Sequence, residues 1–177
     1  HTLSPANEKL LQIVEELGLQ TTFWVSMSGN FFEELENDAS LDYAVKMINT
    51  IRQRVGQFNC EVALYNHSGW FSNPYNEIAI VNALPEADLK LVYNFHHGRE
   101  HMDAFDEIAS AIAPHLIAVN LNGMQAGGEK IMPLGAGDME LEMIETLMGK
   151  GFKGPWGILG HVENVDVKII LKQNING

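Results

Sequence analysis

The stretch "LKLVYNFHHGREH", Leu89–His101, decides how the chain is interpreted, because an apolar segment runs directly into a polar one. A short apolar run bounded by polar residues is typical of a strand that is buried on both faces. Three of the chain's seven histidines, His96, His97 and His101, follow that run. They indicate either a metal or catalytic site or a polar loop that leaves a strand.

The same alternation of apolar strands and amphipathic helices extends along the whole sequence. The first helix is expected to have Ser4 as its N-cap, Pro5 at its first position and Gly18 as its stop. Asn73 is expected to cap the helix that Pro74 opens. The sequence predicts helices at 1–18, 38–56, 73–84, 102–115 and 139–151, a helical tail, and strands at 21–29, 60–67, 89–95, 116–123 and 154–161. Strands that alternate with helices form a parallel sheet, because parallel neighbours cannot be joined by a tight turn.

Two architectures fit a parallel sheet of this kind, a doubly wound open sheet and a closed barrel. A closed eight-stranded barrel typically needs about 250 residues, whereas this chain has 177. Length alone therefore favours the open, doubly wound sheet. No linker or low-complexity segment divides the chain, so a single domain is expected over residues 1–177.

The chain has a formal net charge of −12 and a calculated pI near 4.9. Nucleic acid is an unsuitable partner, because binding it requires basic residues that displace counterions from phosphates. No apolar run approaches the roughly 20 residues that span a bilayer, so no membrane association is expected. The lone Cys60 is interpreted as a small buried residue at the start of a strand. Because the chain begins with His1, a soluble protein in the cytoplasm and one exported after processing both remain open.

Polar side chains end every expected strand, and the carboxyl ends of parallel strands meet at one rim where ligands bind. His67, His97 and His161 come from three different strands, so they are the candidates for acid–base catalysis. The candidate substrate ligands at this rim and in its loops are Asn66, Trp70, Asn94, His96, Asn120, Asn122 and Lys130. The candidate metal ligands are His67, Asn94, His97 and His161.

Several of these residues also have plain structural interpretations. Trp70 is placed either to stack on a sugar ring or to cover the mouth of the sheet, and Lys130 either to meet an anion or to lie in solvent. His101 is either a ligand on the same helical face as His97 or a surface residue of the first turn. His115 is interpreted as a loop or capping residue away from the rim.

Five segments in register resemble the later strands of the xylose isomerase-like sugar phosphate isomerase/epimerase family. They are "VALYNHSGWF", "LVYNFHHGREH", "LIAVNLNGM", "KIMPLGAGD" and "GFKGPWGILGH". The family fold is a TIM barrel, so the resemblance implies a partial barrel of about five βα units that lacks the N-terminal ones. It replaces the doubly wound sheet that length favours. Two exposed sheet edges would then promote self-association, and a homo-oligomer is one expectation.

The resemblance also implies a small-molecule carbohydrate as the partner and one divalent metal, zinc, manganese or a similar ion, as the cofactor. Family members hold that metal with Glu, Asp, His and Glu. In this chain the corresponding positions hold His67 or Asn66, then Asn94, Asn120, and Gly160 or His161. A His and Asn set suits zinc, nickel or iron better than magnesium or manganese.

The expected function is therefore an enzyme that removes a proton beside the carbonyl of a sugar or keto-sugar and isomerises, epimerises or eliminates. His97 resembles a histidine that the family places near the substrate. Because the family's carboxylates are missing, a sugar-binding barrel without catalysis is the alternative. A zinc-dependent DNA-repair endonuclease is disfavoured by the acidic charge.

Overall fold

The structure is a computed structural model that describes residues 3–27, 32, 35–129, 131–160, 162 and 164–177. It contains strands that alternate with helices, as the sequence predicts. The strands are β1 (Thr22–Val25), β2 (Glu61–Tyr65), β3 (Lys90–Asn94), β4 (Leu116–Leu121) and β5 (Trp156–Ile158). The α-helices are α1 (Pro5–Glu16), α2 (Asn37–Gly56), α3 (Pro74–Ala83), α4 (Phe105–Ile112), α5 (Glu140–Gly149) and α6 (Val167–Asn176).

All five strands pair in parallel, and their order across the sheet is their order along the chain, β1-β2-β3-β4-β5. A doubly wound sheet would reverse its strand order at a switch point, whereas a barrel adds each strand beside the previous one. The doubly wound sheet that length alone favours is therefore wrong, and the partial barrel is confirmed. The structure spans an arc whose two outer strands are β1 and β5.

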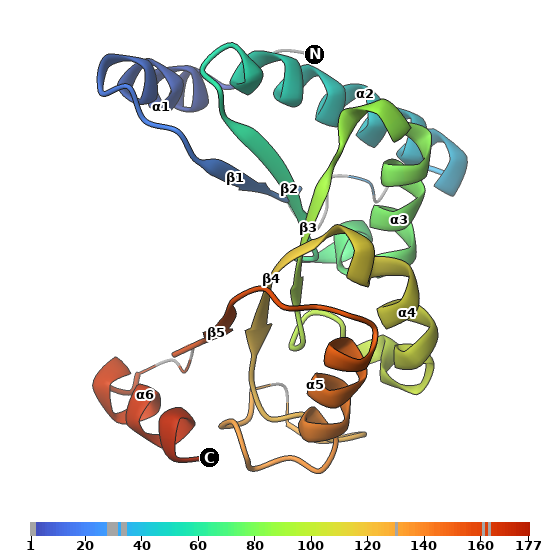
Figure 1. The fold of residues 1–177 in the computed structure, drawn as a ribbon, viewed down its shortest axis with the longest axis vertical. Coiled ribbons are helices and arrows are strands. Elements are labelled where there is room, and N and C mark those ends of the chain that lie inside the picture. The colour runs from blue at the N-terminus through green and yellow to red at the C-terminus, as the bar shows by residue number, and fades with distance from the viewer. Residues whose placement is uncertain (1–2, 28–31, 33–34, 130, 161, 163) are drawn as a thin grey trace.

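Helices α2 to α5 cover the convex face of this arc, as Figure 1 shows. The main core lies between them and the sheet. Strand residues of alternate positions, such as Leu64, Leu91 and Val119, pack there against helix residues such as Ile48 and Ile108. This alternation is the period of two that a strand imposes on its side chains.

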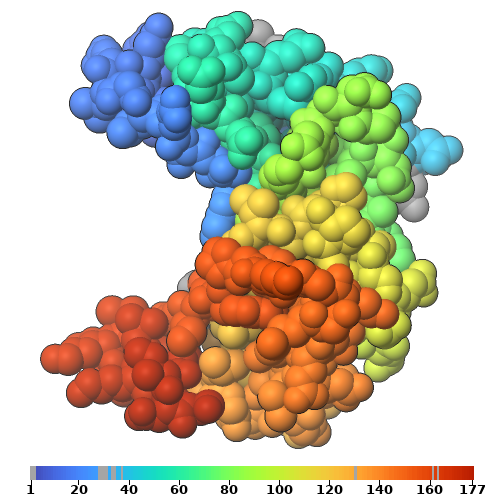
Figure 2. All heavy atoms as spheres, in the orientation of Figure 1, coloured from blue at the N-terminus to red at the C-terminus, as the bar shows by residue number. Residues whose placement is uncertain are grey.

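The concave face carries the other half of each strand. Ala63 of β2, Val92 of β3 and Ala118 of β4 form a small second cluster, with Tyr65 and Ile117 packed against it. Figure 2 shows the hollow on this side of the molecule, between the N-terminal and C-terminal parts of the chain. These apolar side chains cover the middle of the concave face, and the polar residues follow them at the carboxyl ends of the strands.

The predicted signals at helix starts are confirmed. Ser4 caps α1 by accepting a hydrogen bond from Asn7 N, and Asn73 caps α3 in the same way from Tyr75 N. Gly18 follows α1 with a positive φ of 60°, as a helix stop requires. Cys60 is buried directly before β2, as expected.

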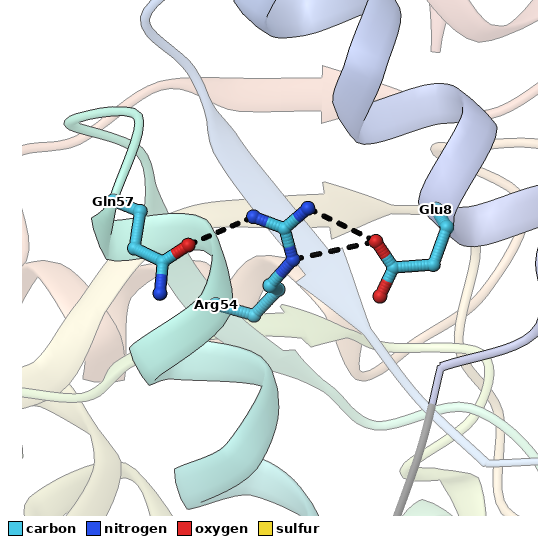
Figure 3. Close-up of polar contacts among 3 residues, drawn as sticks. All are labelled: Glu8, Arg54 and Gln57. Carbon is cyan, nitrogen blue, oxygen red and sulfur yellow. Dashed lines mark hydrogen bonds and ion pairs between the residues drawn. The ribbon is translucent and has the colours of Figure 1, made fainter.

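The first helix is attached to its neighbour by a polar contact in addition to buried apolar side chains. Arg54 of α2 donates through Nε and Nη2 to Glu8 Oε2 of α1, at 3.3 and 3.0 Å, and through Nη1 to Gln57 Oε1 (Figure 3). A charged pair of this partly exposed kind contributes up to about 1 kcal/mol. Burial of Leu11 and Val14 carries most of the attachment.

The last helix is held by an asparagine. Asn174 of α6 is 3% exposed; its Oδ1 accepts a bond from Leu134 N, and its Nδ2 donates to Leu159 O. This places α6 beside the end of β5. Within the described residues, no helix has the length and apolarity required to cross a bilayer.

Candidate functional site

A cavity of about 510 Å³ opens at the carboxyl ends of the strands, on the rim that the sequence indicates. Its walls come from the ends of β2 and β3, from the 3-10 helix at Arg99–Ala104, and from the loops after β4 and β5. The described lining residues are Tyr65, His67, Ser68, Ser72, Asn94, His96, His97, Arg99, Glu100, Asn122, Ile131 and Leu159. A cavity of this size with several polar groups in its wall accommodates a small molecule.

Imidazole rings from two neighbouring strands meet in this cavity. The ring centroids of His67, after β2, and His97, after β3, are 4.3 Å apart, and those of His96 and His97 are 4.7 Å apart. Ser68 Oγ lies 2.9 Å from Nδ1 of His67, which fixes the orientation of that ring. The strand ends therefore place imidazole rings, which serve as acids and bases in many enzymes, against each other.

Tyr65, the last residue of β2, lies on the concave face and contacts both histidines of this pair. Its ring stacks on His67 at 5.7 Å and meets His97 edge-on at 5.9 Å, and its hydroxyl accepts a hydrogen bond from Asn94 Nδ2. Sequence reasoning missed this residue. The signal was available, because Tyr65 is two positions after the inward-facing Ala63 and two before His67.

Two predicted ligands, Asn66 and Asn94, use their amides to lock the two strand ends together. Asn66 has no exposed surface, donates from Nδ2 to Asn94 O, and accepts from Asn94 N at Oδ1. Asn94 Oδ1 in turn accepts from His96 N, which holds the turn that presents His96 and His97. Asn94 lines the cavity and Asn66 does not. A role for Asn66 as a substrate ligand stays a prediction.

The other asparagines on the rim differ in environment. Asn122 lines the cavity and is 4% exposed; its Nδ2 donates to Gly123 O, while its buried Oδ1 has no hydrogen-bond partner in the part of the chain that is described. Asn120 is 6% exposed, and a Cβ added at Gly157 would lie 2.7 Å from its Oδ1. Asn120 therefore packs against β5 and does not line the cavity.

The remaining predicted residues lie outside the cavity lining or outside the described residues. Trp70 packs on Phe32 and Phe71, with ring centroids 4.9 and 5.6 Å away, and it does not line the cavity, so its role as a substrate ligand stays a prediction. His101 lies edge-on to Tyr75 at 6.2 Å. Lys130 and His161 fall outside the described residues.

A carboxylate that the sequence reasoning missed organises the glycine-rich loop at 124–138. Glu140 is 5% exposed; its Oε2 accepts from Met124 N, and its Oε1 accepts from Gly135 N and Gly137 N. Three backbone donors on one carboxylate fix the loop that follows β4. Because Glu140 opens a helix in the sequence, it is indistinguishable there from an ordinary acidic residue of a first turn.

The described residues do not by themselves fit a resident metal. Among them, no group of three or more His, Cys, Asp or Glu side chains is placed to hold an ion. The amide oxygens of Asn66 and Asn94 already accept backbone hydrogen bonds. Of the predicted metal ligands, His67, Asn94 and His97 therefore do not form a metal site by themselves, and His161 lies outside the described residues.

A search with the sequence matches no protein-family model and no curated protein. Solved structures do match. A protein called IolI, described with a bound zinc atom, gives a TM-score of 0.70 at 10% identity over 99% of this chain and 70% of that one. The 3-keto-D-glucoside 4-epimerase YcjR from E. coli gives 0.69 at 11% identity, over 96% and 67%. A D-psicose 3-epimerase determined in the presence of D-fructose gives 0.68 at 14% identity, over 97% and 66%.

These similarities cover nearly all of this chain and about two thirds of each solved structure. Because the sequence identities are so low, they show only that the fold is shared. Zinc, 3-keto-D-glucoside and D-fructose are properties of those proteins. The chain has the fold of the xylose isomerase-like TIM-barrel sugar isomerases and epimerases, over about 70% of the length of that barrel.

Proposed function

We propose that the cavity binds a carbohydrate and moves a proton on the carbon next to its carbonyl, as an isomerase or epimerase does. The observation that carries this proposal is the contact between His67 and His97, whose ring centroids lie 4.3 Å apart in a cavity at the carboxyl ends of β2 and β3. The likeness in fold to sugar epimerases supports the carbohydrate.

The two imidazoles have the roles of base and acid. One neutral ring takes the proton from the carbon, the electron pair moves onto the carbonyl oxygen, and an enediolate forms. A proton returned to the opposite face of the same carbon gives an epimer, and one returned to the neighbouring carbon gives an isomer. General acid–base catalysis of this kind contributes about 100- to 10,000-fold in rate.

The other cavity groups orient the sugar. The Tyr65 hydroxyl and the serines Ser68 and Ser72 line the cavity and exchange hydrogen bonds with hydroxyl groups. Asn122 also lines the cavity, and its Oδ1 is an acceptor without a hydrogen-bond partner in the described structure. These contacts hold the reacting carbon beside the histidine pair.

The test is exchange of the sugar proton with solvent. The protein is incubated with D-fructose in heavy water, and deuterium beside the carbonyl is followed by NMR. His67→Ala and His97→Ala should each lower the rate about 100-fold or more. His115→Ala is the matched control, because His115 directly precedes β4 and therefore lies at the amino end of the strand, opposite the end that lines the cavity. Exchange that persists unchanged in both folded cavity variants would overturn the assigned roles.

A sugar-binding protein without catalysis is the second candidate. Asn94 favours it, because this residue stands where the resembled family keeps an aspartate and its Oδ1 is occupied by His96 N. Calorimetric binding of D-fructose without any deuterium incorporation would select the binding protein.

The expected divalent metal is tested on the same samples. Elemental analysis after purification, followed by addition of zinc, separates a metal-assisted enzyme from one that works with histidines alone. Stoichiometric zinc that raises the exchange rate would favour a site completed by residues outside the described part of the chain.

A further inference from the structure

Arg99 places a permanent positive charge in the wall of the cavity. The chain has 11 Lys and Arg residues against 23 Asp and Glu, so its surface as a whole repels anions. The cavity lacks this excess of acidic groups, because its described lining contains one guanidinium, Arg99, and one carboxylate, Glu100. A guanidinium stays charged at every physiological pH.

The guanidinium is held in place without being neutralised. Arg99 Nη2 donates to the backbone carbonyl of Gly128 at 3.0 Å, and the residue is half-buried. In the part of the chain that is described, no carboxylate lies within ion-pair distance of Arg99. A neutral carbonyl partner leaves its charge available to a ligand, and the fixed position lowers the entropy cost of binding one.

We propose that the sugar bound in this cavity is an acidic one, whose carboxylate pairs with Arg99. This inference rests on the proposed function and names its substrate class. A carboxylate matches the planar fork of a guanidinium by accepting two parallel N–H bonds. Arg99, His67 and His97 line the same cavity, so a sugar whose carboxylate pairs with Arg99 shares that cavity with the histidine pair.

The cavity suits a carboxylate better than a phosphate. A phosphate carries nearly two negative charges and is normally surrounded by backbone N–H groups of a glycine-rich loop. In the glycine-rich loop at 124–138, the N–H groups of Gly135 and Gly137 donate to Glu140, and neither glycine lines this cavity. Glu100 places a negative charge in the wall, and this charge repels a phosphate dianion more strongly than it repels a carboxylate with one negative charge.

Three keto-sugars that differ only at one end test the proposal: D-fructuronate, D-fructose and D-fructose 6-phosphate. Their dissociation constants are measured by calorimetry with the whole chain at low salt. The parent should bind D-fructuronate about tenfold or more tightly than D-fructose, because a charged hydrogen-bonded pair contributes at least about 1.5 kcal/mol. Added sodium chloride should reduce that ratio.

Variants separate a ligand contact from a structural role. Arg99→Gln should bring the ratio of the two dissociation constants close to one, and Arg99→Lys should leave an intermediate ratio, because it keeps the charge and loses the fork. A purely structural role would weaken binding of both sugars equally. Lys153→Gln is the matched control, because this exposed lysine precedes β5 and does not line the cavity. This variant should keep the parent's ratio of the two dissociation constants.

The outcomes separate the two proposals. Equal binding of D-fructuronate and D-fructose overturns the acidic sugar and leaves the keto-sugar site standing. Tightest binding of D-fructose 6-phosphate overturns the carboxylate in favour of a phosphate. Failure to bind any of the three overturns both the acidic sugar and the proposed function.

Discussion

The middle of the sheet and its two ends are built differently. In the middle, Val92 of β3 and Ala63 of β2 are fully buried although they face the concave side. At the ends, Trp24 of β1 is 48% exposed and Ile158 of β5 is 36% exposed. Strands that have neighbours on both sides thus bury their apolar side chains on the concave face, whereas the outer strands leave some apolar side chains exposed. The cavity lies over the well-buried middle strands.

The largest effect should come from the core of the middle strands. Leu91 of β3 is 1% exposed and packs under the covering helices, so Leu91→Ala should lower the free energy of unfolding by about 2–5 kcal/mol. Leu17→Ala is the control, because Leu17 follows α1 and is 65% exposed; it should change stability by less than about 0.5 kcal/mol. Urea denaturation measures both, and equal losses would show that the ends are as well packed as the middle.

The second largest loss of stability is expected at the contact between the loop after β4 and the start of α5. Removing the Glu140 carboxylate leaves three backbone N–H groups without an acceptor, so Glu140→Ala should cost about 1–3 kcal/mol. Amide hydrogen exchange at Gly135 and Gly137 should accelerate at the same time. Glu142→Ala, at an exposed position of the same helix, should do neither. A protected loop in Glu140→Ala would contradict this role.

The smallest change in the free energy of unfolding is expected for a substitution of Glu77 in α3. The change is smallest at acid pH and grows as the pH rises. Burial raises the pKa of its carboxyl well above the usual value of 4.5. Between the ordinary and the raised pKa, the folded state holds a proton that the unfolded state has lost, so stability falls as pH rises through that window. Glu77→Gln cannot ionise and should remove this slope. Denaturation curves from pH 4 upward check it, and a parent without the slope would contradict the burial effect.

Much of the fold could be predicted from the sequence, because each strand and helix has a local signal. Ser4 and Asn73 mark helix starts, and the apolar runs before His67 and His97 mark strands ending at one rim. The choice between a doubly wound sheet and a barrel could not come from length, since strand order depends on which strands pair. The resemblance to a known family supplied it.

The site could be predicted only in part. The strand ends identify the rim, but several polar residues there bond to the protein itself, as Asn66 does with Asn94. Sequence position does not reveal which partner a buried amide finds. Arg99 was missed because an arginine in a loop resembles any surface charge until the wall of the cavity is seen.

Gly98 makes two positions of the chain interdependent. A Cβ at this residue would overlap the hydroxyl of Tyr93, whose ring is 1% exposed and packed between β3 and the helices. A larger residue at position 98 is therefore tolerated only after Tyr93 is shortened. Mutational scans should find that Gly98→Ala is harmful alone and nearly harmless beside Tyr93→Leu. The loop that carries His97 and Arg99 is thus constrained by a buried ring of the strand that precedes it.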